Sequence, residues 1–324
     1  MPFPVTRMLR YRQSQPFRNI LAETSLSKSD LIFPLFINET LKDKQAIQKM
    51  PGIFQQSPTS LLSEVERIVK LGLESVILFG IPAQKDEMAT SAYISGGVIQ
   101  KSIAVIKKEF PQLIVIADCC LCEYTSHGHC GVIENDRLDN DKTLKLLQKV
   151  AISYAENGAD IIAPSGMMDG MIQAIRRALD NHQFPMTSIM SYAVKFASQF
   201  YGPFREAAGS DDCFKGDRKH HQLAFTQKRE SLREALLDVE EGADYLLIKP
   251  GLPYLDIIQT VRERTLLPIV AYQVSGEYAI LKVAAQQGLL NELEAFRETL
   301  ISLKRAGSDL IITYYADEIV QHLG

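Results

Sequence analysis

The segment ESLREALLDVEEGADYLLIKP, residues 230–250, contains the structural unit that recurs along the rest of the chain. Apolar residues recur at helical spacing through its first half, Gly242 follows, and a short apolar run then occupies residues 245–250. A glycine just beyond the last helical turn supplies the left-handed residue that ends many helices. A short continuous apolar run is typical of a strand buried on both faces. The segment therefore predicts a helix that leads into a strand of a parallel sheet.

The same junction recurs as NGAD at residues 157–160 and as RAGSD at residues 305–309, and the segment SLLSEVERIVKLGL has the same helical spacing. Eight apolar runs in all alternate with such segments, and they occupy residues 31–37, 74–79, 113–118, 160–165, 187–192, 245–250, 268–273 and 309–315. Eight alternating units predict a closed (β/α)8 TIM barrel over residues 29–324. Residues 1–28 fall outside these units and are predicted to form an N-terminal arm that makes oligomer contacts.

Composition indicates a globular enzyme of 324 residues rather than a nucleic-acid or membrane protein. The formal net charge is −4 with acidic and basic residues interspersed, which disfavours a cationic surface for DNA or RNA. No apolar run approaches the roughly 18 residues that a membrane span needs. The N-terminus lacks the apolar core of a secretory signal, and the five cysteines do not suggest a disulfide framework. We therefore expect a cytoplasmic location.

The stretch DCCLCEYTSHGHCG, residues 118–131, places cysteines at metal-ligand spacing directly after an apolar run. Cys120, Cys122 and Cys130 can converge on one zinc ion and leave a fourth position open for water or substrate. His127 or His129 could instead fill that position, which would make the site structural. Buried or free thiols without a metal are the remaining alternative.

Two lysines stand in apolar runs where an unpaired ammonium is costly to bury. Lys249 ends the run at residues 245–250, and Lys195 lies in YAVKFA. Each ammonium could reach the barrel rim or pair with an aspartate. A desolvated lysine beside another cation, however, loses its proton readily and can form an imine with a ketone. Since active sites of such barrels lie at the C-terminal strand ends, two lysines there suggest Schiff-base chemistry.

Six separated motifs give the chain a resemblance to the 5-aminolevulinate dehydratase, or porphobilinogen synthase, family over nearly its whole length. In family order they are DCCLCEYTSHGHCG (118–131), IAPSGMMD (162–169), SYAVKFA (191–197), YGPFREAA (201–208), KPG (249–251) and AYQVSGEY (271–278). The resemblance implies condensation of two 5-aminolevulinate molecules to porphobilinogen with loss of two waters, a step in haem and tetrapyrrole biosynthesis.

The resemblance also implies a role for each site residue. Lys195 and Lys249 would each form an imine, with Lys249 holding the propionate-side substrate. Asp118 would orient ligands or relay protons, and zinc on the three cysteines would engage the acetate-side substrate. The residues implied in substrate binding are Arg205, Arg218 and Gln222 on the acetate side, Ser275 and Tyr314 at the other carboxylate, Tyr272 beneath the imine, and Ser165, Tyr192 and Phe204.

Four further features bear on the comparison with this family. Residues 201–222 form a loop long enough to be a lid. Glu234 matches a position where some bacterial members bind a second, non-catalytic magnesium, although an ordinary solvated glutamate explains it equally well. His221 stands where many relatives carry tyrosine, and Cys119 adds a thiol. The resemblance also implies a homo-octamer built from arm-exchanged dimers.

Two other functions are consistent with parts of the pattern. One is a class I aldolase-like barrel with a single imine lysine and a structural zinc. The other is a non-catalytic zinc-binding scaffold that has kept the fold, against which Lys195, Lys249, Asp118 and the three cysteines argue.

Overall fold

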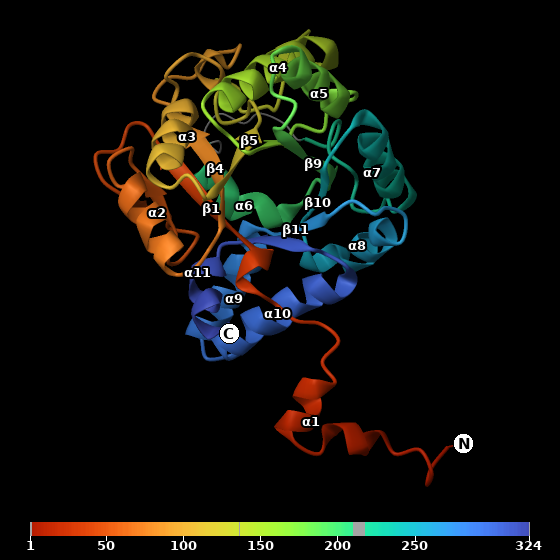
Figure 1. The fold of residues 1–324 in the computed structure, drawn as a ribbon. Helices are drawn as coiled ribbons and strands as arrows, with labels where there is room; N and C mark the ends of the chain where they lie inside the picture. The colour runs from red at the N-terminus through yellow and green to blue at the C-terminus, as the bar shows by residue number, and fades with distance from the viewer. Residues whose placement is uncertain (1, 136, 210–217, 324) are drawn as a thin grey trace.

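The computed structural model describes residues 2–135, 137–209 and 218–323. Eight parallel strands lie in sequence order around a ring, and pairing of β1 with β12 closes it into a barrel (Figure 1). The strands are β1 (Leu31–Asn38), β4 (Ser75–Ile81), β5 (Ile114–Cys119), β8 (Ile161–Pro164), β9 (Ser188–Lys195), β10 (Tyr245–Lys249), β11 (Ile269–Gln273) and β12 (Leu310–Thr313). Each falls on one of the eight apolar runs, so the (β/α)8 prediction is confirmed.

Helices pack around the outside of this barrel (Figure 1). The longer ones are α2 (Leu61–Lys70), α3 (Val98–Glu109), α4 (Asn140–Glu156), α5 (Met171–Asn181), α7 (Arg229–Glu241), α8 (Leu255–Arg262), α9 (Ser275–Gln286) and α10 (Glu292–Ala306). The glycines of the three repeated junctions, Gly158, Gly242 and Gly307, all have positive φ, between 97° and 117°. These junctions end helices as the sequence predicted, because a left-handed residue is strained for other side chains.

Shorter elements lie between the barrel units and on the N-terminal segment. The helices are α1 (Gln15–Ile20), α6 (Gly202–Ala207) and α11 (Ala316–Ile319). The 3-10 turns are Met8–Arg12, Lys28–Asp30, Thr90–Ala92, Gln199–Tyr201, Leu252–Tyr254 and Val320–His322. Strand β3 (Phe54–Gln56) pairs with β1 and with β2 (Gln45–Ala46), whereas β6 (Val132–Glu134) and β7 (Arg137–Asp139) pair with each other.

The barrel strands are buried on both faces, since the barrel interior and the helices each cover one of them. All seven residues of β4 are buried, and seven of the eight in β9 are as well. This burial explains why the strands appear in the sequence as continuous apolar runs without alternation. It also means that a charged residue in such a strand is desolvated.

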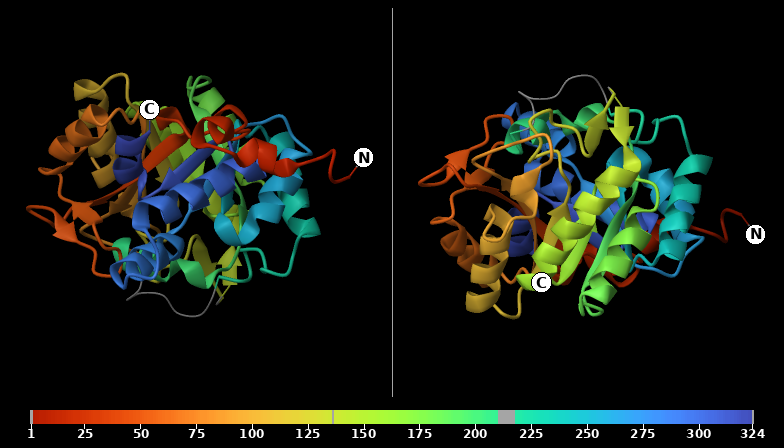
Figure 2. Two further views of the ribbon diagram at one scale, coloured as in Figure 1. Left: turned by 90° about the horizontal axis from the view of Figure 1, so that it is seen from below. Right: turned by 90° about the horizontal axis from the view of Figure 1, so that it is seen from above.

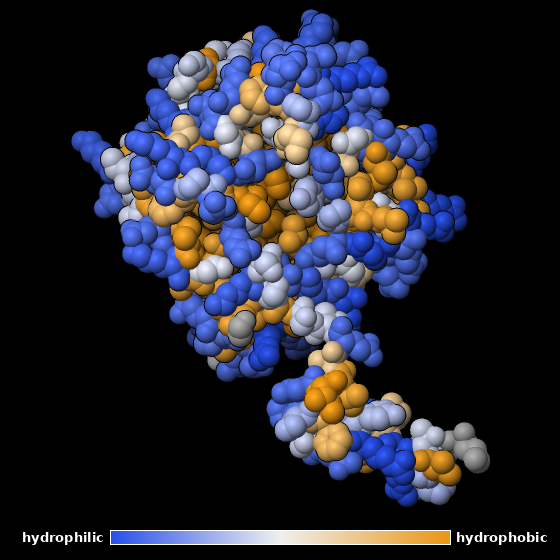
Figure 3. Space-filling view, viewed as in Figure 1, coloured by the Kyte–Doolittle hydropathy of each residue, from blue (hydrophilic) through white to orange (hydrophobic). Residues whose placement is uncertain are grey.

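The N-terminal residues extend away from the barrel as an arm (Figures 1 and 2). The arm exposes large apolar side chains, with Phe3, Leu9 and Ile20 each more than 70% exposed, and apolar surface is visible on it in Figure 3. Exposed apolar side chains gathered on a projecting segment are typical of a surface that another chain covers. Among the described residues, no helix combines the length and apolarity needed to cross a bilayer.

Candidate active site

Lys195 and Lys249 are the last residues of the adjacent strands β9 and β10, and the strand register pairs them directly. Both side chains are buried, 6% and 4% exposed. The C-terminal end of a (β/α)8 barrel is where such enzymes hold their catalytic groups. The fold thus brings two lysines that are 54 positions apart in sequence into one desolvated site.

The Lys249 ammonium lies among aromatic rings. Its Nζ is 4.2 Å from the ring centre of Tyr272, 4.7 Å from that of Phe204, 5.2 Å from that of Tyr201 and 5.5 Å from that of Tyr192. Burial lowers the pKa of Lys249 to about 7, and the positive charge of the neighbouring lysine contributes to the decrease. Near neutral pH a large fraction of this amine is therefore unprotonated and nucleophilic.

Lys195 has a different environment. Its Nζ donates a hydrogen bond of 2.7 Å to the carbonyl oxygen of Ser165. Burial alone lowers the pKa of Lys195, but negative charge on the cysteine cluster, first of all on Cys130, outweighs it and raises that pKa above its usual value. Because their surroundings push their pKa values apart, the two lysines can take different roles in proton transfer.

Asp118 lies beside both lysines at the end of β5. Its carboxylate accepts a hydrogen bond of 3.2 Å from the hydroxyl of Ser165. Burial raises the pKa of Asp118 well above its usual range, and negative charge on Glu123 and Cys120 contributes. A carboxyl group that is only 7% exposed and retains its proton more easily is suited to giving and taking protons within the site.

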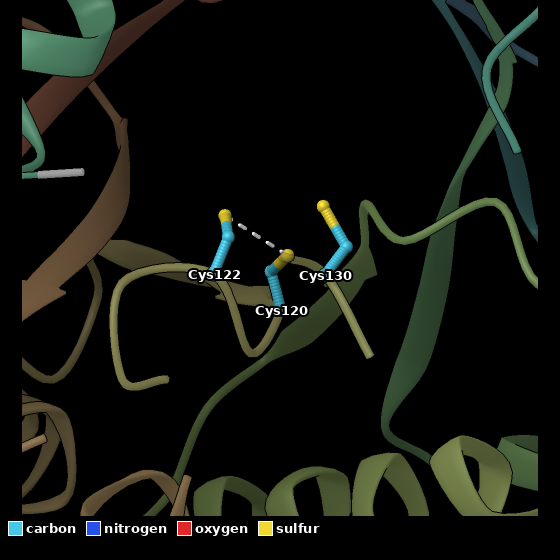
Figure 4. A group of neighbouring side chains, drawn as sticks. All are labelled: Cys120, Cys122 and Cys130. Atoms are coloured by element: carbon cyan, nitrogen blue, oxygen red, sulfur yellow. Dashed lines mark hydrogen bonds between the residues drawn. The ribbon is translucent and has the colours of Figure 1, made fainter. Parts of the chain in front are cut away.

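The three predicted metal cysteines converge (Figure 4). The ligand atoms of Cys120, Cys122 and Cys130 all lie within 4.8 Å of one another, and the Sγ atoms of Cys120 and Cys122 are 3.3 Å apart. Hydrogen bonds from the other two thiols hold the pKa of Cys130 well below its usual value. Three buried thiol groups on one loop fit a soft or borderline cation such as zinc.

Cys119, His127 and His129 belong to the same stretch of sequence but are not in the three-cysteine group. Cys119 points the other way, with its Sγ 3.7 Å from the carbonyl oxygen of Leu147 on α4. Among the described residues, the groups that could hold a metal include neither His127 nor His129. The arrangement therefore favours a three-thiol site with an open position over a structural site closed by histidine.

Glu123 belongs to this site although the sequence prediction did not include it. It is 3% exposed, and its Oε2 accepts a 3.1 Å hydrogen bond from the Cys122 thiol. Its ligand atom also lies within 4.8 Å of those of Asp118 and Cys120. The sequence signal for Glu123 was its position directly after Cys122. A carboxylate that is buried in such a loop requires a partner.

A cavity joins these groups, and its lining includes both lysines, Asp118, Cys122 and Glu123. Ser165, Phe204, Arg205 and Arg218 also line it. Arg218 is buried and donates a 2.9 Å hydrogen bond from Nη2 to the carbonyl oxygen of Gly128 in the cysteine loop. The cavity thus combines amines, carboxyl groups, thiols and guanidinium groups.

The remaining predicted tyrosines and serine lie on the neighbouring strand ends. The hydroxyls of Tyr272 and Tyr314 are 2.9 Å apart, and both side chains are fully buried. Ser275 begins α9, and its Oγ accepts a 2.9 Å hydrogen bond from the backbone N–H of Phe204. Tyr192 lies in β9 with its ring 5.5 Å from the Nζ atoms of both lysines.

Three predicted positions lie elsewhere. They are Gln222, His221 and Glu234, which line a second hollow together with Asp169 and Glu230. Glu234 is not in any of the three-ligand groups found among the described residues. Of the predicted lid, α6 covers residues 202–207, and residues 210–217 lie outside the described residues.

Known proteins resemble this chain over nearly its whole length. The family model for "Delta-aminolevulinic acid dehydratase" matches residues 5–322. Proteins of that name from Archaeoglobus fulgidus and Bacillus subtilis are 52% and 51% identical to this chain; the first alignment covers 99% of both chains and the second 98% of both. A crystal structure of the Toxoplasma gondii enzyme in complex with the reaction product porphobilinogen superposes with a TM-score of 0.95 at 41% identity, covering 98% of this chain and 91% of that one.

Proposed function

The chain belongs to the delta-aminolevulinic acid dehydratase family, and we propose that it forms porphobilinogen through imines on Lys195 and Lys249 beside a three-cysteine zinc site. It is a lyase with the porphobilinogen synthase activity of that family. The observation that carries the proposed mechanism is the direct pairing of the two buried lysines in register at the barrel mouth.

Lys249 is the nucleophile for the propionate-side substrate in this proposal. Its neutral amine attacks the keto carbon of the propionate-side 5-aminolevulinate, and the resulting carbinolamine loses water to leave a C=N bond. The pKa of about 7 for this amine supports the assignment. Ser275 and Tyr314 would bind the carboxylate of this substrate, and Tyr272 would pack beneath the imine.

Lys195 would form the other imine, with the acetate-side substrate. Its ammonium must first lose a proton, and Asp118 with Ser165 would accept and return protons in these steps. Arg205 and Arg218 would bind the carboxylate of the acetate-side substrate, since a guanidinium can bind a carboxylate through two parallel hydrogen bonds. Gln222, which lines the second hollow, would contribute to binding of the acetate-side substrate. Tyr192 and Phe204 would exclude water around the two amines.

Cys120, Cys122 and Cys130 would hold zinc. The bound zinc would supply a Lewis acid to an oxygen or the free amine of the acetate-side substrate. We also propose magnesium at Glu234. Because one carboxylate is a sparse ligand set, such an ion would keep several waters.

The N-terminal arm would pack on a second copy of the chain in a homo-octamer. The exposed apolar side chains of the arm support this proposal, because they remain uncovered on a single chain.

A colour assay for porphobilinogen made from 5-aminolevulinate tests the proposed function. Lys249→Arg and Lys195→Arg are each expected to reduce turnover by at least about a thousandfold, because arginine keeps the charge but cannot act as the amine nucleophile. Lys282→Arg is the matched control, since Lys282 is also a buried lysine but pairs with Glu292 and Glu318 away from the cavity. Wild-type turnover in either active-site variant would contradict the two-imine mechanism. An adduct on one lysine without pyrrole product would instead favour a single-imine aldolase.

A further inference from the structure

Glu277 is a buried carboxylate in the first turn of α9 that the mechanism above does not use. It is 4% exposed and accepts three backbone hydrogen bonds. Its Oε2 accepts from the N–H of Val274 at 2.7 Å and from that of Gly251 at 3.3 Å, and its Oε1 accepts from that of Leu252 at 2.6 Å.

Only the bond from Val274 is the usual contact of a helix-capping glutamate. The other two cross to a different loop, at residues 251 and 252, which directly follows Lys249 and Pro250. One carboxylate therefore ties the loop after β10 to the loop after β11. Capping of α9 alone would not require the hydrogen bonds from Gly251 and Leu252.

The two loops carry functional groups of the proposed site. Lys249 ends β10, and Ser275 immediately follows Val274. The start of α9 also packs closely against the backbone of Phe200, because a Cβ added at Gly276 would lie 2.6 Å from the carbonyl oxygen of Phe200. Because Lys249 and Ser275 each adjoin one of the two loops, a small shift of either loop would change the spacing between the amine and the serine hydroxyl.

We propose that Glu277 is a positioning residue that fixes the Lys249 amine relative to Ser275, and so aligns the keto carbon of a substrate whose carboxylate Ser275 holds. This inference rests on the proposed function, because it assumes that Lys249 forms an imine. Both carboxylate oxygens are needed as acceptors. An amide in place of the carboxylate would point an N–H group at one of the backbone donors and leave it unsatisfied.

Separate measurement of the two imines tests this role. Wild type and Glu277→Gln are mixed with 5-aminolevulinate, quenched with borohydride over time, and digested, and the reduced adduct is quantified on the Lys249 and Lys195 peptides. We expect Glu277→Gln to slow adduct formation at Lys249 by about ten- to a hundredfold, as a displacement of the order of 1 Å does, while the rate at Lys195 changes by less than about threefold. A purely structural defect would slow both together.

Two further variants complete the test. Asn291→Ala removes the side chain that caps α10 by accepting from the N–H of Glu294 at 3.0 Å, so it is a matched loss of a helix cap and should leave the ratio of the two rates unchanged. Glu277→Asp keeps the charge but is one methylene shorter, and it should also slow Lys249 selectively. If Glu277→Gln does not fold, Glu277→Asp decides the result.

The outcomes distinguish the two proposals. Absence of any adduct in the wild type during pyrrole formation would overturn the two-imine mechanism itself. Adducts on both wild-type lysines, with an unchanged ratio of rates in the folded Glu277 variant, would overturn only the positioning role.

Discussion

Replacing Lys249 with methionine is expected to abolish turnover and to stabilise the fold below pH 7. Among the described residues Lys249 forms no salt bridge, and its Nζ contacts aromatic rings. Burial lowers its pKa from 10.5 to about 7. At about 1.4 kcal/mol for each tenfold change in the proton equilibrium, the buried ammonium costs on the order of 5 kcal/mol at low pH.

The sign of the pH dependence follows from proton linkage. Below pH 7 both the native and the unfolded chain bind the proton, and the full cost is present. Between pH 7 and 10.5 only the unfolded chain binds it, so the stability of the wild type rises with pH. The advantage of Lys249→Met should therefore be largest at pH 6 and smaller by about 3 kcal/mol at pH 9.

Urea unfolding of wild type and variant at the two pH values measures this difference. Lys282→Met is the control, because Lys282 donates to Glu292 at 2.7 Å and to Glu318 at 2.5 Å. Its loss leaves two carboxylates unpaired and should destabilise the fold by about 1–3 kcal/mol. If Lys249→Met destabilises the protein at pH 6 as much as the control does, the account of Lys249 as a costly unpaired ammonium is wrong.

Three other predictions concern the metal, the amine and the arm. Cys122→Ala and Cys130→Ala should lose bound zinc by metal analysis and lose turnover, whereas Cys119→Ala should keep both because its thiol faces α4. Chelation should inactivate the wild type, with recovery on addition of zinc and reductant; full activity in zinc-free protein would contradict this. The rate of adduct formation at Lys249 should rise through about pH 7 as the amine loses its proton, and a rate independent of pH from 5 to 8 would exclude that pKa. Deleting residues 2–28 should yield smaller assemblies by light scattering with reduced activity, and an unchanged mass would refute the role of the arm.

The barrel could be predicted from sequence because burial on both faces turns every strand into a local, continuous apolar run. Lys249 could be recognised for the same reason, since a charged residue at the end of such a run is conspicuous. The cysteine loop was equally local, because its three ligands lie within eleven positions.

Groups defined by contacts between distant loops could not be predicted in this way. Glu277 looks like a capping glutamate until the fold brings residues 251 and 252 to its carboxylate. The role of Glu123 depends on its contacts with Asp118 and Cys120, whose ligand atoms come within 4.8 Å of its own only once the strand and the loop have folded. Gln222 is close in sequence to Arg218, yet it lines a different hollow, because spacing within a loop does not fix where a side chain points.

Trapping of the imines tests the central claim most directly. Zinc-loaded enzyme is reduced with borohydride during turnover of isotopically labelled 5-aminolevulinate, and each lysine peptide is analysed by mass spectrometry. The account predicts labelled secondary amines on Lys249 and Lys195, and none on Lys282. Continued pyrrole formation with no label on either Lys249 or Lys195 would contradict it.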